Sequence, residues 1–92
     1  MANVRSHLII EGRLQGVWFR DSTKREANRL NVTGWGKNRY DENVELIAEG
    51  SKENVAKLTE WCHNGPPAAR VTGVNESIED YTGEFASFEI IY

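Results

Sequence analysis

The chain has 92 residues, of which 39% are apolar and 27% are charged, and its formal net charge is −3. This length suits one domain, residues 1–92, built around a single core. No run approaches the roughly 18 apolar residues of a membrane-spanning helix, and the N-terminus lacks the apolar segment of a secretory signal. We therefore expect a cytoplasmic protein without a membrane partner. The single cysteine, Cys62, cannot form an internal disulfide, which agrees with a reducing compartment.

The charges are divided unevenly along the chain. Residues 1–40 contain eight Lys and Arg against three Asp and Glu, whereas residues 41–92 contain three against eleven. A basic first half can concentrate positive potential for small anions, while the net acidity argues weakly against a nucleic-acid partner. The two halves can equally well intermix in space, so that their fields cancel. The sequence leaves both interpretations open.

The first part of the chain predicts a strand, a loop and a helix. Apolar residues alternate over Ser6–Glu11, with Leu8 and Ile10 on one face, which is typical of a strand. Thr23 and Glu26 have the spacing of a capping box, so we expect a helix to begin there. This helix would turn Ala27 and Leu30 inward and end at Asn31 in the left-handed conformation.

The remaining elements follow at regular intervals. Two strands, Thr33–Asn38 and Val44–Glu49, flank a hairpin loop at Tyr40–Asn43. Ser51 is placed to cap a second helix with Val55, Leu58 and Cys62 at helical spacing, ended by the Asn-Gly-Pro-Pro stretch of residues 64–67. Further strands begin at Val71 and at Phe88, the last after a polar, acidic loop.

This order of elements indicates an α+β protein with a ferredoxin-like split βαβ arrangement, βαββαβ plus a short C-terminal strand. We expect an antiparallel sheet with both helices on one face. In that topology the first two strands run parallel with another strand between them. The end of the first strand and Asn38 would therefore lie at the same edge of the sheet.

The loop between the first strand and the first helix is rich in residues that suit an anion. The first N–H groups of a helix lack partners and can bind an anion. Gly12 and Gly16 let the backbone approach a ligand, and Arg20 offers a planar fork of donors. The spacing is not that of a Walker loop or a dinucleotide fingerprint. From the residues alone, an anion site and a simple turn of the chain both remain possible.

Two motifs carry a resemblance to a known family. Gly12–Arg20, GRLQGVWFR, resembles the signature loop of the acylphosphatase family, and Gly34–Asn38, GWGKN, resembles its second signature. Residues 65–71 and 88–90 also fit, so the resemblance spans the chain. Among the departures, Asn31 stands where the family usually ends a helix with Gly. Glu42 replaces a hairpin Gly, which puts the type of that turn in question.

The resemblance implies hydrolysis of the carboxyl–phosphate bond of acyl phosphates, with no metal and no cofactor. Arg20 and Asn38 are then the catalytic residues: Arg20 binds the phosphoryl oxygens and Asn38 positions the attacking water. The partner is a small-molecule acyl phosphate, inorganic phosphate is product and competitive inhibitor, and the protein is expected to be a monomer. The backbone N–H groups of the loop would bind the phosphate, namely those of Gln15, Gly16, Val17, Trp18, Phe19 and Arg20.

The chemistry of this reaction suits a site without a histidine or a carboxylate. An acyl phosphate expels a carboxylate whose conjugate acid has a pKa of about 4, so the leaving oxygen needs no proton from the protein. What remains is to hold the phosphoryl charge and to place a water in line, and these effects dominate enzymatic phosphoryl transfer.

Other candidate sites are weaker. His7 and His63 are too isolated to suggest a metal site, and Cys62 fits core packing better than a reactive thiol. Trp18 and Phe19 either anchor the loop to the core, which is favoured, or stack on the acyl part of a substrate. Among binding modules with this fold, an RNA binder would need aromatic residues on the central strands, and residues 8–10 and 44–49 contain none. A metallochaperone would need a C-x-x-C motif, and the chain has a single cysteine. A carbamoyl-phosphate or protein-partner binder remains as a rival.

Overall fold

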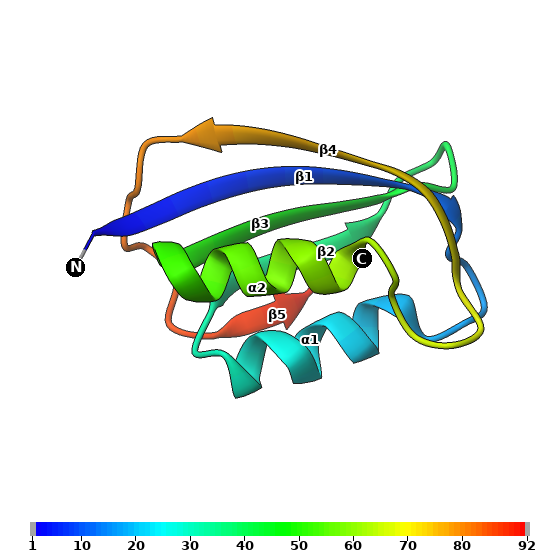
Figure 1. Cartoon of the computed structure of the whole chain (residues 1–92), viewed down its shortest axis with the longest axis horizontal. Coiled ribbons are helices and arrows are strands. Elements are labelled where there is room, and N and C mark those ends of the chain that lie inside the picture. Colours follow the sequence, from blue (N-terminus) through cyan, green and yellow to red (C-terminus); the bar gives the residue numbers. More distant parts are fainter. Residues whose placement is uncertain (1, 92) are drawn as a thin grey trace.

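The computed structural model describes residues 2–91, and the elements alternate as the sequence predicts (Figure 1). Helix α2 packs against β1 and β3, and α1 packs against β2 and β5, so that both helices cover one face of the sheet. The fold is therefore α+β and ferredoxin-like. The elements in chain order are β1 (Asn3–Arg13), α1 (Phe19–Arg29), β2 (Thr33–Asn38), β3 (Val44–Ser51), α2 (Lys52–Cys62), β4 (Arg70–Glu79) and β5 (Phe88–Ile90).

The sheet has the strand order β4-β1-β3-β2-β5. Strands β1 and β2 both pair antiparallel with β3, so they run in the same direction on either side of it. Val44 pairs with Ile10 of β1 on one side and with Asn38 of β2 on the other. The C-terminal ends of β1 and β2 therefore lie at the same edge of the sheet, as the topology predicts.

The expectation of a wholly antiparallel sheet needs one correction, because β5 pairs parallel with β2. Strand β4 ends where Glu79 pairs with Arg5, near the start of β1. Residues 80–87 then cross that end of the sheet, so β5 begins at Phe88 beside Gly34, at the start of β2. Because both strands start from the same end, they run in the same direction.

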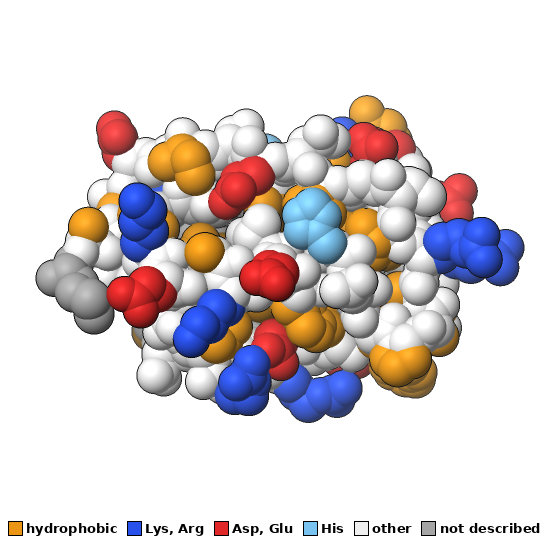
Figure 2. Space-filling model, in the orientation of Figure 1, with side chains coloured by type: hydrophobic (Ala, Val, Ile, Leu, Met, Phe, Trp, Pro, Cys, Tyr) orange, Lys and Arg blue, Asp and Glu red, His pale blue; other side chains and the backbone are white. Residues whose placement is uncertain are grey.

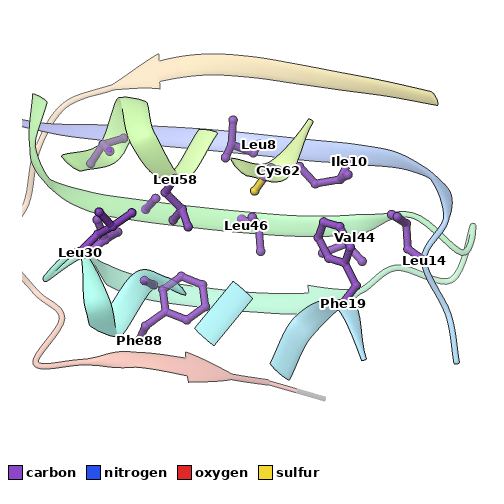
Figure 3. Packing of buried hydrophobic residues seen from close by; sticks show 14 residues of the cluster. Leu8, Ile10, Leu14, Phe19, Leu30, Val44, Leu46, Leu58, Cys62 and Phe88 are labelled. Atoms are coloured by element: carbon purple, nitrogen blue, oxygen red, sulfur yellow. The ribbon is translucent and has the colours of Figure 1, made fainter. Parts of the chain in front are cut away.

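The core lies between the sheet and the two helices (Figure 3). The residues that the sequence places inward on the first strand and the first helix are all buried, and the stripe of α2 is likewise buried. Ser6 and Thr23 are buried as well, which the sequence does not predict. Burying a large apolar side chain of this kind stabilises the fold by about 1.5–3 kcal/mol. Burial also raises the pKa of the Cys62 thiol to about 12, which leaves it inert near neutral pH. The buried apolar residues are Leu8, Ile10, Leu14, Phe19, Ala27, Leu30, Val32, Val44, Leu46, Ile47, Ala48, Val55, Leu58, Cys62 and Phe88.

The predicted start of the first helix is wrong, because α1 begins at Phe19, before the expected cap at Thr23. The ring of Phe19 is 1% exposed and packs on Trp61 with their centroids 5.7 Å apart. This tertiary contact favours a helix that starts earlier. The Thr23 hydroxyl donates instead to the carbonyl of Phe19 at 2.8 Å, a bond within the helix, and Glu26 pairs with Arg29.

Other local predictions are confirmed. Asn31 follows α1 with φ 57°, in the left-handed region. The Ser51 hydroxyl accepts a hydrogen bond from the N–H of Asn54 at 3.2 Å and so caps α2. Strand β2 has the bounds that the sequence predicts, whereas β1 and β3 extend further than expected.

The basic and acidic halves of the sequence intermix in space. Arg5 pairs with Glu49, Glu79 and Glu84, and Lys24 pairs with Glu89. Figure 2 shows basic and acidic side chains side by side on the face that carries the helices. Of the two interpretations that the sequence leaves open, the structure supports mixing. Within residues 2–91, no helix is long and apolar enough to cross a membrane.

Candidate active site

The loop from β1 to α1 uses its two glycines for different purposes. A bulge at Glu11 and Gly12 shifts the register of β1 against β4. A Cβ on Gly12, whose φ is 139°, would lie 2.0 Å from the carbonyl oxygen of Arg70. Contrary to expectation, this glycine therefore allows close packing of β4 and not the approach of a ligand. Gly16 has φ 74°, and a Cβ there would meet nothing within 4 Å. Only Gly16 therefore faces open space in the loop.

A pocket of about 240 Å³ lies between this loop, the start of α1 and the end of β2. It brings Arg20, the second residue of α1, together with Asn38, the last residue of β2. Val17 does not line it, because its side chain packs against the core. The one lining carboxylate in the described part of the chain is Asp21. The lining residues are Leu14, Gln15, Gly16, Trp18, Phe19, Arg20, Asp21 and Asn38.

The backbone N–H groups of the loop beside this pocket have few acceptors within the protein. The first helical hydrogen bond of α1 runs from the N–H of Ser22 to the carbonyl of Trp18, at 2.9 Å. Within residues 2–91, none of the N–H groups of residues 15–19 has a backbone or side-chain acceptor within 3.5 Å in good hydrogen-bond geometry. These groups lie at the positive end of the α1 dipole, in the loop that precedes Arg20. The arrangement suits an anion with several oxygens.

Asn38 is held by a side chain that sequence reasoning missed. Its Nδ2 donates to Oε1 of Gln15 at 2.8 Å, and Nε2 of Gln15 donates to the carbonyl of Glu42 at 3.4 Å. The sequence indicated a role for the backbone of Gln15 only. Its side chain links the loop to Asn38 and to the hairpin after β2.

The hairpin forms a closed turn with Glu42 in the left-handed region. Glu42 has φ 71°, and its N–H donates to the carbonyl of Arg39 at 3.1 Å. The N–H of Arg39 donates to the carbonyl of Asn43 at 2.7 Å, which closes the loop. The side chain of Asp41 accepts from the N–H of Asn43 and pairs with Arg39. A non-glycine residue thus occupies a left-handed position in this turn.

The two aromatic residues of the loop have opposite environments. Phe19 is buried and anchors the loop, as expected, whereas Trp18 is 74% exposed and does not. Trp18 precedes α1 with φ 61° and ψ 30°, so its backbone is also left-handed. Besides the pocket, it lines a neighbouring hollow together with Val17, Pro66 and Pro67. Of the two roles weighed for Trp18, core anchoring is excluded.

The remaining candidates lie outside the pocket. Nε2 of His7 donates to Glu45 at 2.6 Å, and His63 follows the end of α2. The part of the chain that the structure describes contains no group of three or more His, Cys, Asp or Glu residues placed to hold a metal ion. Lys37 and Arg39, which flank Asn38, do not line the pocket and pair with Glu45 and Asp41.

Comparison with known proteins identifies the family. The acylphosphatase family model matches residues 6–90. The chain is 48% identical to an acylphosphatase from Pelotomaculum thermopropionicum over all of both chains. It is 50% identical to one from Pyrobaculum islandicum, over 99% of this chain and 97% of the relative. The crystal structure of acylphosphatase from Bacillus subtilis superposes with a TM-score of 0.93 at 34% identity, over 97% of this chain and 99% of that one. The chain therefore belongs to the acylphosphatase family.

Proposed function

We propose that this chain hydrolyses the carboxyl–phosphate bond of acyl phosphates without a metal or a cofactor. Arg20 and the backbone N–H groups of residues 15–20 hold the phosphoryl group, and Asn38 positions the attacking water. One observation carries the proposal. Arg20 and Asn38, far apart in the sequence, line one pocket in which the loop leaves its N–H donors open.

The phosphoryl group is held by the positive charge of Arg20 and by hydrogen bonds that reach its oxygens from two sides. The guanidinium of Arg20 can donate two parallel hydrogen bonds to two phosphoryl oxygens, while the loop N–H groups approach them from another side. Because these donors are fixed by the fold, they need no reorganisation as charge shifts during the reaction. The anchoring of the loop through the buried Phe19 keeps them in place.

The reaction balances without a protein acid or base. Water oxygen attacks phosphorus, the bond from phosphorus to the carboxyl oxygen breaks, and its electron pair leaves on the carboxylate. The two protons of the water depart on dihydrogen phosphate, which then equilibrates with solvent. The leaving carboxylate is weakly basic, with a conjugate acid of pKa about 4. Asn38 therefore only has to orient the water through a hydrogen bond.

Arg20 and the N–H groups of residues 15–20, which together form a phosphate cradle, also account for the expected partners. Inorganic phosphate has the oxygens that Arg20 and the loop bind, so it competes with the substrate. The protein is proposed to act as a monomer, with Arg20 and Asn38 supplied to the pocket by the same chain. We propose a single domain over residues 1–92 that acts in the cytoplasm on small molecules, with no nucleic-acid or membrane partner.

The exposed indole of Trp18 gives the pocket an apolar wall. The acyl part of a bound substrate must leave the phosphate cradle somewhere, and Trp18 lines both the cradle and the hollow beside it. A ring that is 74% exposed offers a face for stacking. We therefore place the acyl group against Trp18.

Steady-state hydrolysis of benzoyl phosphate, with and without EDTA, tests the proposed function. We expect turnover that is unchanged by the chelator. Absence of turnover overturns the function and favours the anion-binding rival. Activity that EDTA abolishes and magnesium restores overturns the metal-free mechanism.

A further inference from the structure

We infer that the side chain of Gln15 is a positioning residue that fixes which end of the Asn38 amide faces the attacking water. The inference rests on the proposed function, because it assigns a role to Gln15 within that reaction. It is carried by two hydrogen bonds that join the Asn38 and Gln15 amides to the carbonyl of Glu42.

The direction of these bonds follows from the first acceptor. A backbone carbonyl can only accept, so the carbonyl of Glu42 requires the NH₂ group of Gln15 to point toward it. The Oε1 atom of Gln15 is then turned toward Asn38 and accepts from Nδ2 at 2.8 Å. The amide of Asn38 is thereby oriented, with Oδ1 on the side away from the Gln15 amide.

This orientation matters for the nucleophile. A water that attacks phosphorus must direct a lone pair at it, so the protons of the water need acceptors on the other side. Oδ1 of Asn38 can accept such a proton, whereas its NH₂ group would donate to the lone pair that is needed for attack. An Asn amide without a fixed partner can turn over about its terminal torsion, which is broad and roughly two-fold. Gln15 removes this freedom.

The position of Gln15 suits this role. It lines the pocket together with Asn38, and it also lines a second hollow together with Glu42. Its backbone belongs to the phosphate loop, so one residue ties the direction of the water-positioning amide to the phosphoryl donors. Glu42, whose carbonyl accepts from the Gln15 side chain, is itself the left-handed residue of the hairpin turn.

Gln15→Leu removes both side-chain bonds but keeps the backbone N–H of residue 15. We expect kcat for benzoyl phosphate to fall roughly 10- to 100-fold, because misplacing a positioning group by an ångström can cost that much. The inhibition constant of inorganic phosphate should stay within about two-fold of its original value, since the loop donors and Arg20 are unchanged. Arg29→Ala, at an exposed position late in α1, controls for nonspecific effects.

Gln15→Glu provides a signature that a merely structural role would not produce. When protonated, the introduced carboxyl group can donate to the Glu42 carbonyl and accept from Asn38. When ionised, it cannot donate and adds repulsion toward the phosphate. The kcat of this variant relative to the unsubstituted protein should therefore rise as the pH falls toward about 4, the ordinary range of a glutamic acid.

A double-mutant cycle decides whether Gln15 acts through Asn38. If it does, Gln15→Leu combined with Asn38→Ala should turn over no more slowly than Asn38→Ala alone. Multiplied losses, an unchanged kcat for Gln15→Leu, or a matched loss of phosphate affinity would overturn the inference. The unsubstituted protein is measured first, so absence of turnover there counts against the proposed function and not against Gln15. In that case the side-chain NH₂ resonances of Asn38 test the inference alone: Gln15→Leu should shift them, and unmoved resonances would overturn it.

Discussion

Both ends of β1 gather hydrogen-bond donors that suit an anion, but among the described residues only the backbone donors near the start of β1 bond a carboxylate of the chain. Near the start of β1, the carboxylate of Glu49 is 1% exposed. It accepts hydrogen bonds from Arg5 at 3.2 Å, from the N–H and hydroxyl of Thr82 at 3.0 and 2.9 Å, and from the N–H of Gly83 at 3.1 Å. Near the other end, Arg20 and the loop N–H groups form a similar set of donors around an open pocket.

We call the Glu49 end of β1 the closed end and the Arg20 end the open end. The difference between them distinguishes a structural site from a candidate functional site. At the Glu49 end an internal carboxylate saturates the donors, and the bonds hold residues 80–87 across the sheet so that β5 can pair with β2. At the Arg20 end the chain leaves its backbone donors for an anion from solution. An arginine beside backbone N–H groups therefore indicates an anion site only when no carboxylate of the chain accepts hydrogen bonds from those N–H groups.

The largest expected effect concerns the open end. Arg20→Ala should lower kcat/KM for benzoyl phosphate about 100- to 1000-fold or more, because one lost transition-state donor typically costs about 3–4 kcal/mol. It should also weaken the binding of inorganic phosphate. Asn38→Ala should lower kcat while leaving phosphate binding nearly intact. Equal loss of phosphate affinity in the two variants would overturn this division of roles.

At the closed end, Glu49→Gln should lower the free energy of unfolding by about 1–3 kcal/mol, because buried donors lose a charged acceptor. Burial raises the pKa of the Glu49 carboxyl, but the bonds from Thr82, Arg5 and Gly83 outweigh burial and hold it below its ordinary value of 4.5. The folded state therefore binds the proton less readily than the unfolded state. Glu49 stabilises the fold above the unfolded pKa, and this contribution is lost as the pH falls through the lower folded pKa.

Urea unfolding from pH 7 down to pH 3 measures both the stability and its slope. Glu49→Gln should flatten the loss of stability below pH 4.5, whereas Glu53→Gln, at an exposed position in the first turn of α2, should not. Identical pH profiles for Glu49→Gln and the unsubstituted protein would show that the closed end does not depend on this charge.

A smaller effect is expected at the wall of the open pocket. Trp18→Ala should raise KM for benzoyl phosphate about 2- to 10-fold, in line with the roughly 0.5–1.5 kcal/mol that aromatic pairs contribute beyond burial. Acetyl phosphate, which has no ring, should be affected much less, and it serves as the matched control. A similar change in KM for both substrates would contradict a contact between Trp18 and the acyl group.

The smallest effect concerns the hairpin that carries the carbonyl bonded to Gln15. Glu42 has φ 71°, where a side chain costs roughly 1–2 kcal/mol, partly offset by the extra freedom of glycine in the unfolded chain. Glu42→Gly should therefore stabilise the protein by about 0.5–1 kcal/mol in thermal or urea unfolding. Glu42→Ala keeps the strain and should show no such gain; an equal gain from Ala would point to charge instead of backbone conformation.

The sequence predicted features that local chemistry determines. The cap at Ser51, the left-handed Asn31 and the bounds of β2 all follow from residue type and immediate neighbours. The start of α1 did not follow, because the burial of Phe19 against Trp61 is a tertiary contact that outweighs a capping motif. The parallel direction of β5 also did not follow, because it depends on where residues 80–87 cross the sheet, which no local pattern encodes.

The candidate site divides in the same way. Arg20 and Asn38 were identified by motif, and the topology of the sheet predicted that they would meet. The side chain of Gln15 was missed because its partners come from a different strand and a different turn. The interpretation of Gly12 as an anion-binding glycine is wrong because the sequence does not show which group packs closely against a glycine. Here the backbone of β4 does so.

Titration with inorganic phosphate, followed through the backbone amide resonances, tests the open cradle most directly. We predict saturable shifts at residues 15–20, little change at Thr82 and Gly83 where Glu49 already occupies the donors, and loss of the saturable shifts in Arg20→Ala. Resonances of residues 15–20 that stay unmoved at saturating phosphate, or that respond equally in Arg20→Ala, would contradict the account.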